Sequence, residues 1–559
     1  MSLKVIWKIK NESDRQYEAE AKYNETIYDI LVRNGVKLQA SCGGSGHCGK
    51  CGVTVVKGTK TVSKQDQAFF SKEELTAGKR LSCCLKLQKD TEVLLESFLN
   101  ASILTEYTGT DISPLSETGH TRKNSPLSEI GHTRKNSPLS EIGQTHKNRS
   151  LSETRQTSDK SGTADNKTAV GAAIDIGTTT IVWQAVNLES GGVMATYAEL
   201  NRNISYGSDV LSRIQASVQG KGKAIQQQLK MQLEEGIRHL TDMTGSMPEK
   251  IIIAANTTMI HLLMGYDCSR LGIYPFQPVT VERIDMSLMP GTEKIPCIIL
   301  PGISAFVGAD ILAGLTHIHF YEKKEPCFFL DIGTNGEMAL FDGKSRCLVT
   351  SASAGPAFEG GNISCGTGCI DGAVEKAVIR DGHCVVKTIR NQQANGICGS
   401  ATIELLYELK KNKLIDEAGL LVESYREKGY PVTMDAAGKE IRLTQDDIRA
   451  LQMAKGAIAA GVDILLKRMK MTPDMIKEVY LSGGFAAHLD LHKALGIGLL
   501  PKIWENRICV VGNTSLQGAA GGFFEKNDDI YRRERSMTQE IYLSGEDEFE
   551  PLYLKNMYL

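Results

Sequence analysis

The sequence predicts a multidomain protein whose largest part has an α/β fold. From residue 169 onward, short apolar runs alternate with amphipathic runs of helical spacing, as they do in α/β proteins. Two segments of this part, AAIDIGTTT at 172–180 and LDIGTNGE at 330–337, each read as a strand that ends in an aspartate and a turn of Gly and Thr. The backbone N–H groups of such turns can bind an anion. Two similar turns in one chain indicate two similar halves that hold a phosphate between them.

Composition limits the class of protein. A chain of 559 residues is too long for one hydrophobic core, which indicates several domains. The formal net charge is −2, so bulk charge does not favour binding to nucleic acid or to an acidic membrane surface. The N-terminal stretch MSLKVIWKIKNESDR lacks the apolar core of a secretory signal, and no apolar run reaches the length of about 18 residues that a membrane span needs. We therefore expect a cytoplasmic protein with no nucleic-acid or membrane partner.

Residues 1–98 carry the pattern of a small α+β domain. Residues 3–9 and 16–21 alternate between apolar and polar side chains, as the two strands of a hairpin do. Thr26 is suited to cap a helix whose apolar residues recur at helical spacing, with Gly35 just past its end. A last strand is expected near 91–96.

A cluster of cysteines lies in the same domain. Five of the 14 cysteines lie in the first 84 residues, none lies between 85 and 267, and nine are scattered afterwards. The loop SCGGSGHCGKCGV places Cys42, Cys48 and Cys51 at C-x5-C-x2-C, and RLSCCL adds a fourth thiol at Cys83 or Cys84. Three thiolates on one glycine-rich loop and one distant thiolate are the ligands that a 2Fe-2S cluster needs.

Two other metal sites compete with this interpretation. Four cysteines can also hold zinc, but zinc sites usually pair two short C-x2-C hairpins, so the iron–sulfur cluster is favoured. A Rieske centre needs two histidines, and only His47 lies near these cysteines. Residues 1–98 resemble 2Fe-2S ferredoxin domains of the β-grasp type. In that family the fourth ligand stands in a motif like L-x-C-Q, so the resemblance selects Cys83 and places Cys84 where the family has glutamine.

The remaining cysteines are expected to be reduced thiols that pack as small apolar side chains. This includes Cys365 and Cys369, whose C-x3-C spacing favours two packed thiols over a second cluster.

Residues 99–168 differ in composition from the rest of the chain. The 12-residue sequence SPLSETGHTRKN at 113 is followed by the variants SPLSEIGHTRKN at 125 and SPLSEIGQTHKN at 137, with a decayed copy at 149. Each copy offers too few apolar side chains to offset the entropy of ordering, and a solenoid is not expected. We expect a flexible low-complexity linker; the alternative is a docking motif that orders on a partner.

Three motifs in order identify the α/β part. DIGTTT, DIGTNGE and SGGFAAH resemble the phosphate 1, phosphate 2 and adenosine motifs of the actin, sugar-kinase and heat-shock chaperone (ASKHA) superfamily. Members of that superfamily have duplicated, RNase H-like α/β halves with ATP in the cleft. The resemblance implies a first half at 169–325, a second half at 326–540 and a C-terminal tail at 541–559.

The same resemblance implies roles for the motif residues. Asp175 and Asp331 would hold Mg²⁺ through water. Glu337 and Asp310 are candidates to position the attacking water. The residues expected around the β and γ phosphates are Gly177, Thr178, Thr179, Gly333, Thr334 and Asn335, and those expected beside the adenosine are Gly483 and Gly484.

The complete order of motifs is more specific. A ferredoxin domain, a linker and then IDIGTTT, NTTMIHLLMG, PFQPV, VGAD, LDIGTNGE, SAGPAFEGG, GICGSATIE, LSGGFAAH and GNTSLQGAA resemble the ATP-dependent reductive activators of corrinoid proteins. Two features depart from that family. Its members carry a small additional domain before the ATPase part, which residues 99–168 are not expected to form, and GTGCIDGA at 366–373 differs from the usual run after SAGPAFEGG.

The resemblance implies an ATP-hydrolysing iron–sulfur enzyme that reduces the inactive Co(II) of a corrinoid protein to Co(I), as anaerobic methyltransferase systems for O-demethylation require. The implied partners are that corrinoid protein, an upstream electron donor such as a ferredoxin, flavodoxin or reductase, and a second copy in a homodimer. Two alternatives stay open: a small-molecule kinase with a redox regulatory domain, and a non-catalytic nucleotide-binding redox sensor.

Overall fold

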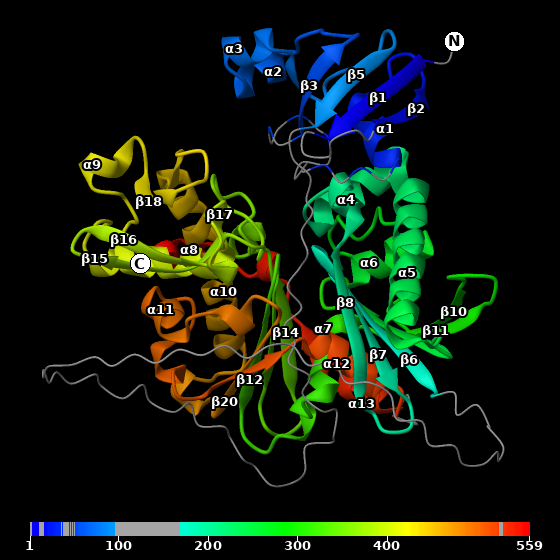
Figure 1. The fold of residues 1–559 in the computed structure, drawn as a ribbon. Coiled ribbons are helices and arrows are strands. Elements are labelled where there is room, and N and C mark those ends of the chain that lie inside the picture. Colours follow the sequence, from blue (N-terminus) through cyan, green and yellow to red (C-terminus); the bar gives the residue numbers. More distant parts are fainter. Residues whose placement is uncertain are drawn as a thin grey trace, which may run out of the picture. The chain divides into compact units, whose positions relative to one another are not determined.

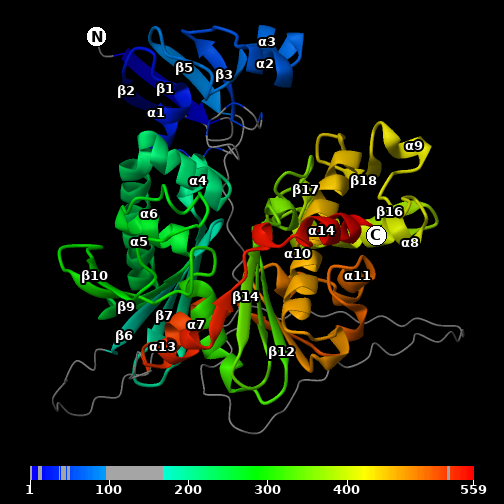
Figure 2. The same cartoon turned by 180° about the vertical axis from the view of Figure 1, so that it is seen from behind.

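The structure is a computed structural model, shown from two sides in Figures 1 and 2. It describes residues 3–9, 16–34, 51–95, 168–524 and 529–559, together with the single positions 36, 38, 44, 46 and 49. The 12-residue repeats that the sequence predicts to be a linker lie outside the described residues. No helix in the described ranges is long and apolar enough to cross a membrane.

The N-terminal domain is built on a five-stranded sheet in the order β2-β1-β5-β3-β4. Strand β1 is parallel to β5, whereas the other neighbours are antiparallel. The elements are β1 (Leu3–Ile9), β2 (Gln16–Ala21), α1 (Ile27–Arg33), β3 (Gly52–Lys57), α2 (Lys64–Phe69), α3 (Lys72–Thr76), β4 (Lys79–Leu81) and β5 (Thr91–Leu95). The hairpin, the helix and the last strand that the sequence predicts are confirmed, and the parallel pairing of the first and last strands is the β-grasp arrangement.

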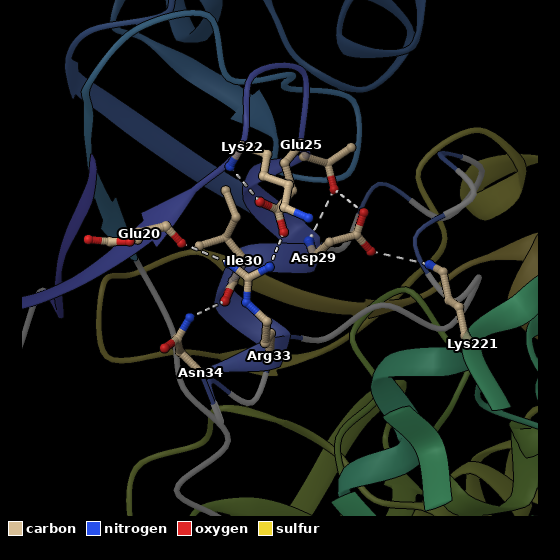
Figure 3. A network of polar contacts seen from close by, with 9 residues as sticks. Glu20, Lys22, Glu25, Asp29, Ile30, Arg33, Asn34 and Lys221 are labelled. Atoms are coloured by element: carbon tan, nitrogen blue, oxygen red, sulfur yellow. Dashed lines mark hydrogen bonds and ion pairs between the residues drawn. The ribbon is translucent and has the colours of Figure 1, made fainter. Parts of the chain in front are cut away.

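Helix α1 begins and ends where its side chains satisfy the backbone. The hydroxyl of Thr26 accepts a hydrogen bond from the Asp29 N–H at 3.1 Å, which caps the first turn. At the other end, the Asn34 amide donates to the Ile30 carbonyl oxygen at 2.8 Å (Figure 3). Arg33 bonds the carboxylate of Glu25 and donates to the Glu20 carbonyl oxygen at 2.8 Å. The helix is therefore tied to strand β2 and to the turn that follows it.

The first α/β half is built on a six-stranded sheet in the order β10-β11-β9-β6-β7-β8. Its elements are β6 (Val170–Ile176), β7 (Thr180–Asn187), β8 (Val193–Leu200), α4 (Val210–Ala216), α5 (Gly222–Thr244), β9 (Lys250–Ala255), α6 (Thr257–Met264), β10 (Ile284–Leu288), β11 (Ile295–Ile299) and α7 (Ala309–His317). Helix α5 packs on this sheet at Gly236, where a Cβ would lie 2.2 Å from the ring of Trp183. Only glycine lets the helix approach the strand so closely.

The second half has a sheet in the order β21-β20-β12-β13-β14-β22. Its first five strands in this order correspond to β11-β9-β6-β7-β8, whereas the sixth strand lies at opposite edges of the two sheets. Its strands are β12 (Cys327–Ile332), β13 (Gly336–Phe341), β14 (Cys347–Ala352), β20 (Glu478–Ser482), β21 (Ile508–Gly512) and β22 (Thr538–Glu540). In both halves the first strand is antiparallel to the second and parallel to the next strand on its other side. The predicted duplicated α/β fold is thereby confirmed.

The chain from residue 373 onward contains further elements. They are β15 (Ala373–Arg380), β16 (His383–Thr388), β17 (Gly396–Ile397), α8 (Gly399–Lys411), α9 (Glu423–Arg426), β18 (Tyr430–Met434), β19 (Glu440–Leu443), α10 (Gln445–Arg468), α11 (Leu491–Gly496), α12 (Thr514–Gly521), α13 (Asp529–Ser536) and α14 (Phe549–Met557). The segment expected as a C-terminal tail thus contains helix α14, which packs against α10. The Gln452 amide of α10 donates to the Met557 carbonyl oxygen at 2.9 Å.

Both faces of the second sheet are buried. Along β12, Phe328 and Leu330 point into a core that includes Ile458 of α10. Cys327 and Phe329 point to the opposite face, into a core continuous with the first half. This two-residue alternation, with apolar side chains on both faces, explains why the strand reads as a continuous apolar run.

Helix α12 joins the two halves. It follows strand β21 of the second sheet, yet it packs against α7 and β6 of the first half, and α7 and α12 lie side by side (Figure 1). The two helices approach so closely that a Cβ on Gly518 would lie 2.3 Å from the Ala313 carbonyl oxygen. This packing brings residues 513–515 next to the first Gly–Thr turn.

Candidate functional site

The two Gly–Thr turns occupy equivalent places in the two halves. Residues 177–179 connect β6 to β7, and residues 333–335 connect β12 to β13. Each turn closes through its glycine: the Gly177 N–H donates to the Thr180 carbonyl oxygen and the Gly333 N–H to that of Asn335, both at 2.9 Å. A Cβ on Gly177 would lie 2.8 Å from the Thr180 carbonyl oxygen, so the first turn needs glycine. The turns lie between the strands where the sequence predicts them, and the N–H groups of these two glycines bond within the turns.

The threonine hydroxyls of the two turns meet at one carboxylate. Thr179 Oγ1 lies 3.1 Å from Thr334 Oγ1. Both hydroxyls donate to Glu359 Oε2, at 2.7 and 3.0 Å. Glu359 belongs to the segment SAGPAFEGG and ends the 3-10 helix Pro356–Glu359. An oxygen with two such donors is bound as a phosphate oxygen would be, so this point is an anion position to which each half contributes one hydroxyl.

The two aspartates at the strand ends are held by distant residues. Asp175 accepts hydrogen bonds from the Asn513 amide at 2.7 Å and the Ser515 hydroxyl at 2.8 Å. Asp331 accepts one from the Ser482 hydroxyl at 2.6 Å. These donors fix both carboxylates beside the turns, at the end of the strand that leads into each.

The carboxylates around the turns share a poorly solvated region. Burial raises the pKa of Asp331 to about 6, and the charges of Asp175 and Glu359 add to the rise. Burial and then the charge of Asp175 raise the pKa of Asp310 to about 7. Burial, Asp310 and Asp331 raise the pKa of Glu337 well above its ordinary value. Such a set of oxygen donors favours a cation that would relieve their repulsion.

Magnesium fits this donor set as a water-bridged ion. Within the described residues, no three carboxylate, imidazole or thiol groups converge to bind a metal directly. Mg²⁺ commonly keeps several of its waters in protein sites.

A buried arginine supports the first turn. Arg213 of α4 donates from Nη2 to the Thr178 carbonyl oxygen at 2.6 Å and from Nε to that of Gly207 at 2.9 Å. Burial lowers its pKa to about 9, opposed by Asp209 and Glu359, and the guanidinium still carries a positive charge at neutral pH. The Asn256 amide, which caps α6, donates to Thr178 Oγ1 at 3.2 Å. Arg213 and Asn256 therefore hold the first turn through Thr178. The Arg213 guanidinium also places positive charge near the anion position.

Residues 482–488, expected beside the adenosine, lack the helix that the sequence predicts after Gly484. Gly483 has a φ of +99°, and a Cβ there would lie 2.7 Å from the Ile332 carbonyl oxygen, so glycine is required. Gly484 is exposed. The helix expected to follow is a single 3-10 turn, Ala486–His488. A new helix, α11, begins after Asp490, whose side chain accepts the Lys493 N–H and so caps it.

Two of the four predicted cluster ligands lie in the described part of the N-terminal domain. Cys51 Sγ and Cys83 Sγ are 3.2 Å apart, although 32 residues separate them in sequence. The loop glycines at 44, 46 and 49 all have positive φ, and a Cβ on Gly49 would lie 2.5 Å from the Phe69 ring. Adjacent thiols and a tightly turned glycine loop fit a small inorganic cluster. Cys42 and Cys48 lie outside the described residues.

The structure also places Cys84, Cys365 and Cys369, whose roles the sequence does not assign. Cys84 Sγ lies 3.8 Å from Cys83 Sγ and 3.3 Å from the position of a Cβ on Gly46. Cys369 is exposed. Cys365, its expected partner, packs against the core of the second half.

Several residues of the site were not predicted. They are Glu359, Arg213, Asn256, Ser482, Asn513 and Ser515. Five of them lie in motifs that the sequence displays, namely SAGPAFEGG, NTTMIHLLMG, LSGGFAAH and GNTSLQGAA. A polar residue inside one of these motifs could have indicated a site residue. Arg213 lies on helix α4, and no motif of the sequence marks it as a site residue.

Comparisons with known proteins cover the same three parts. Family models match residues 10–88 as a 2Fe-2S iron-sulfur cluster binding domain, 170–323 as the RACo middle region, and 325–559 as the C-terminal domain of RACo, the ASKHA domain. The corrinoid activation enzyme RamQ of Eubacterium limosum is 26% identical over 96% of this chain and 97% of its own length. The [Co(II) methylated amine-specific corrinoid protein] reductase of Methanosarcina barkeri is 24% identical over 69% of this chain and 76% of its own.

A solved structure shows the same architecture. The reductive activator for corrinoid, iron-sulfur protein aligns with a TM-score of 0.65 and 26% identity, and covers 100% of this chain and 98% of that one. The fold and the sites thus define a 2Fe-2S domain protein with a duplicated ASKHA part. The chain belongs to the RACo family.

Proposed function

We propose that this protein is an ATP-hydrolysing iron–sulfur reductase that reactivates a corrinoid protein by reducing Co(II) to Co(I). One observation carries the proposal: relatives named as a corrinoid activation enzyme and a Co(II) corrinoid protein reductase align with this chain, the first over 96% of its length and the second over 69%. The positions of the Gly–Thr turns and of the adjacent thiols agree with a protein that couples a nucleotide to electron transfer.

The ASKHA part binds ATP through the two turns. Thr179 and Thr334, with Thr178, Asn335 and the turn residues Gly177 and Gly333, surround the β and γ phosphates, while the 483–484 segment borders the adenosine. Asp175 and Asp331 would hold Mg²⁺ through water, and the ion would neutralise charge on the phosphates. Glu337 or Asp310 accepts the proton of the water that attacks the γ-phosphate, and ADP and phosphate are the products.

The N-terminal part holds the electron carrier. Cys42, Cys48, Cys51 and Cys83 are the proposed ligands of a 2Fe-2S cluster. Such a cluster supplies one electron at a time, at about −400 mV for the plant type. Each 59 mV by which the acceptor potential falls below that of the donor costs a factor of about ten in a one-electron equilibrium.

Nucleotide binding offsets such a deficit only if the ATP and ADP forms of the protein bind the corrinoid partner with different affinities, because a ligand shifts an equilibrium through differential binding alone. We propose that the ATP-bound form binds the Co(II) partner tightly, and that hydrolysis releases it after reduction. The upstream donor is a ferredoxin, a flavodoxin or a reductase. Homodimerisation remains part of the proposal, as does a location in the cytoplasm, where cysteine thiols stay reduced.

The test is a reconstitution without oxygen. Purified protein, a strong one-electron donor, a Co(II) corrinoid protein and MgATP are mixed, and the absorbance of Co(I) is followed. Rapid Co(I) formation that needs ATP and is lost in Cys48→Ser supports the proposal. Co(I) formation that ignores both ATP and this substitution would refute it. Phosphorylation of a small metabolite without any corrinoid requirement would favour a kinase instead.

A further inference from the structure

Asn201 lies directly behind the first Gly–Thr turn. It follows strand β8 and is completely buried. Its side-chain Nδ2 donates to the Gly177 carbonyl oxygen at 2.9 Å. Its backbone N–H donates to the Thr179 carbonyl oxygen at 2.8 Å. One residue therefore holds the carbonyl groups at both ends of the turn.

The orientation of the Asn201 amide is fixed by its other neighbours. Its Oδ1 accepts a hydrogen bond from the Asn203 N–H at 3.0 Å, which caps the 3-10 helix Arg202–Tyr206. Because only the amide oxygen can accept this bond, the amide nitrogen must face the turn. Nδ2 also lies 3.5 Å from Met259 Sδ, a weak acceptor on helix α6. Both ends of the amide thus have partners, and the donor to the turn is set in one orientation.

The middle carbonyl of the turn is directed to the same buried side. Arg213 Nη2 donates to the Thr178 carbonyl oxygen at 2.6 Å. The peptide bonds of the turn are trans, and in a planar trans peptide the C=O of one residue and the N–H of the next point in opposite directions. Since the Gly177 and Thr178 carbonyls point to buried donors, the N–H groups of Thr178 and Thr179 point away from this buried side.

We propose that Asn201 is a positioning residue for the phosphates of ATP. By holding two carbonyl oxygens on the buried side of the turn, it directs the N–H groups of Thr178 and Thr179 to the phosphate oxygens. A carbonyl that turned to the front would place a partial negative charge against the phosphate and would withdraw the N–H of the next residue. Asn201 acts through the turn and does not itself bind the nucleotide. The inference rests on the proposed function, which takes ATP as the ligand.

Asn201→Ala removes the donor to Gly177, and Asn203→Ala is its matched control. Asn203 is equally buried, but its amide donates to the Ile225 carbonyl oxygen at 3.4 Å and not to the turn. Isothermal titration calorimetry of the full chain with its cluster, in the presence of Mg²⁺, compares a non-hydrolysable ATP analogue with adenosine. In Asn201→Ala the Kd for the analogue should rise about tenfold, the order expected for the loss of one hydrogen bond. The Kd for adenosine, which has no phosphate, should not change, and Asn203→Ala should leave both values as in the wild type.

Asn201→Ser is a second variant in case Asn201→Ala does not fold. The serine hydroxyl can still accept the Asn203 N–H and cap the 3-10 helix, but it is too short to reach the Gly177 carbonyl oxygen. It should show the same loss of affinity for the analogue alone. An unchanged affinity for the analogue in a folded Asn201 variant, or an equal loss for the analogue and adenosine, would overturn the inference.

Co(I) formation with ATP is measured on the same samples, so that the inference and the proposed function can fail separately. If the wild type binds the analogue and the variants lose only that affinity, the positioning role stands even if no Co(I) is formed, whereas the proposed function fails. If the wild type does not bind the analogue, both are wrong.

Discussion

Replacing Glu359 by glutamine is expected to tighten ATP binding. The Glu359 carboxylate accepts hydrogen bonds from the hydroxyls of Thr179 and Thr334, which are the groups predicted to bind the terminal phosphate. A phosphate and a carboxylate cannot share these donors, so ATP has to displace Glu359. Glutamine keeps an acceptor oxygen of similar shape but removes the negative charge, so the fold should be retained and the displacement should become easier.

The magnitude follows from the two hydrogen bonds. A hydrogen bond to a charged group contributes about 1.5–3 kcal/mol and one between neutral groups about 1 kcal/mol, so two bonds weaken by roughly 2 kcal/mol in total. That difference corresponds to about a 30-fold lower Kd for ATP. Two unit charges left about 4 Å apart would repel by about 4 kcal/mol at an effective dielectric constant near 20, which is an upper limit because the glycine-flanked segment can move.

Isothermal titration calorimetry with a non-hydrolysable ATP analogue and Mg²⁺ measures this effect. Glu375→Gln is a matched control, because that carboxylate lies on β15 and pairs with Lys387 at 2.7 Å, away from the turns. ADP, which lacks the γ-phosphate, should show a smaller gain in Glu359→Gln. Burial raises the pKa of Glu359, so the wild-type carboxylate becomes neutral as the pH falls and the difference between the two proteins should shrink.

An affinity equal to or weaker than that of the wild type would refute this reasoning, since it would show that Glu359 and the phosphate do not compete. A large loss of turnover with an unchanged Kd would instead make Glu359 a catalytic group that acts on the attacking water.

The other predictions concern the metal sites and pH. Asp175→Asn should abolish Co(I) formation while the visible spectrum of the cluster stays intact, as measured on one sample. Cys83→Ser should lose the cluster spectrum and its iron, whereas Cys84→Ser should keep both. Without nucleotide, stability should fall as the pH rises from about 4 to about 7, because the pKa values of Asp331 and Asp310 are raised to about 6 and 7 and the folded state binds more protons than the unfolded state. Thermal unfolding should show a smaller fall in Asp310→Asn; an equal fall would contradict this assignment.

The elements that the sequence predicts well are those fixed by neighbours in the chain. The hairpin alternation of β1 and β2 and the capping of α1 by Thr26 are local patterns, and the structure reproduces both. The two turns are likewise local, because an aspartate at a strand end and the adjacent Gly–Thr residues set their shape. These features can be predicted without knowing which distant segments pack against them.

The features that the sequence could not predict depend on distant partners. Glu359 accepts a hydrogen bond from Thr179, which lies 180 residues earlier in the chain. No local sequence pattern around a glutamate predicts a contact over such a separation. Arg213 is charged and lies on a helix, and sequence interpretation places such residues at the surface, whereas here it is buried under the first turn. The helix expected after Gly484 stops early because the Asp490 cap starts a new one.

The hydrogen bonds of Asp175 can form only after most of the chain has been synthesised. Its partners Asn513 and Ser515 are 338 and 340 residues further along the chain. At about 5–20 residues per second, a ribosome needs roughly 15–70 s to reach them after it has made the first turn. Until then the turn lacks the donors that orient its aspartate, so a nascent or truncated chain cannot complete the proposed ATP site. Under the proposed function, ATP hydrolysis therefore requires a chain whose synthesis is nearly finished.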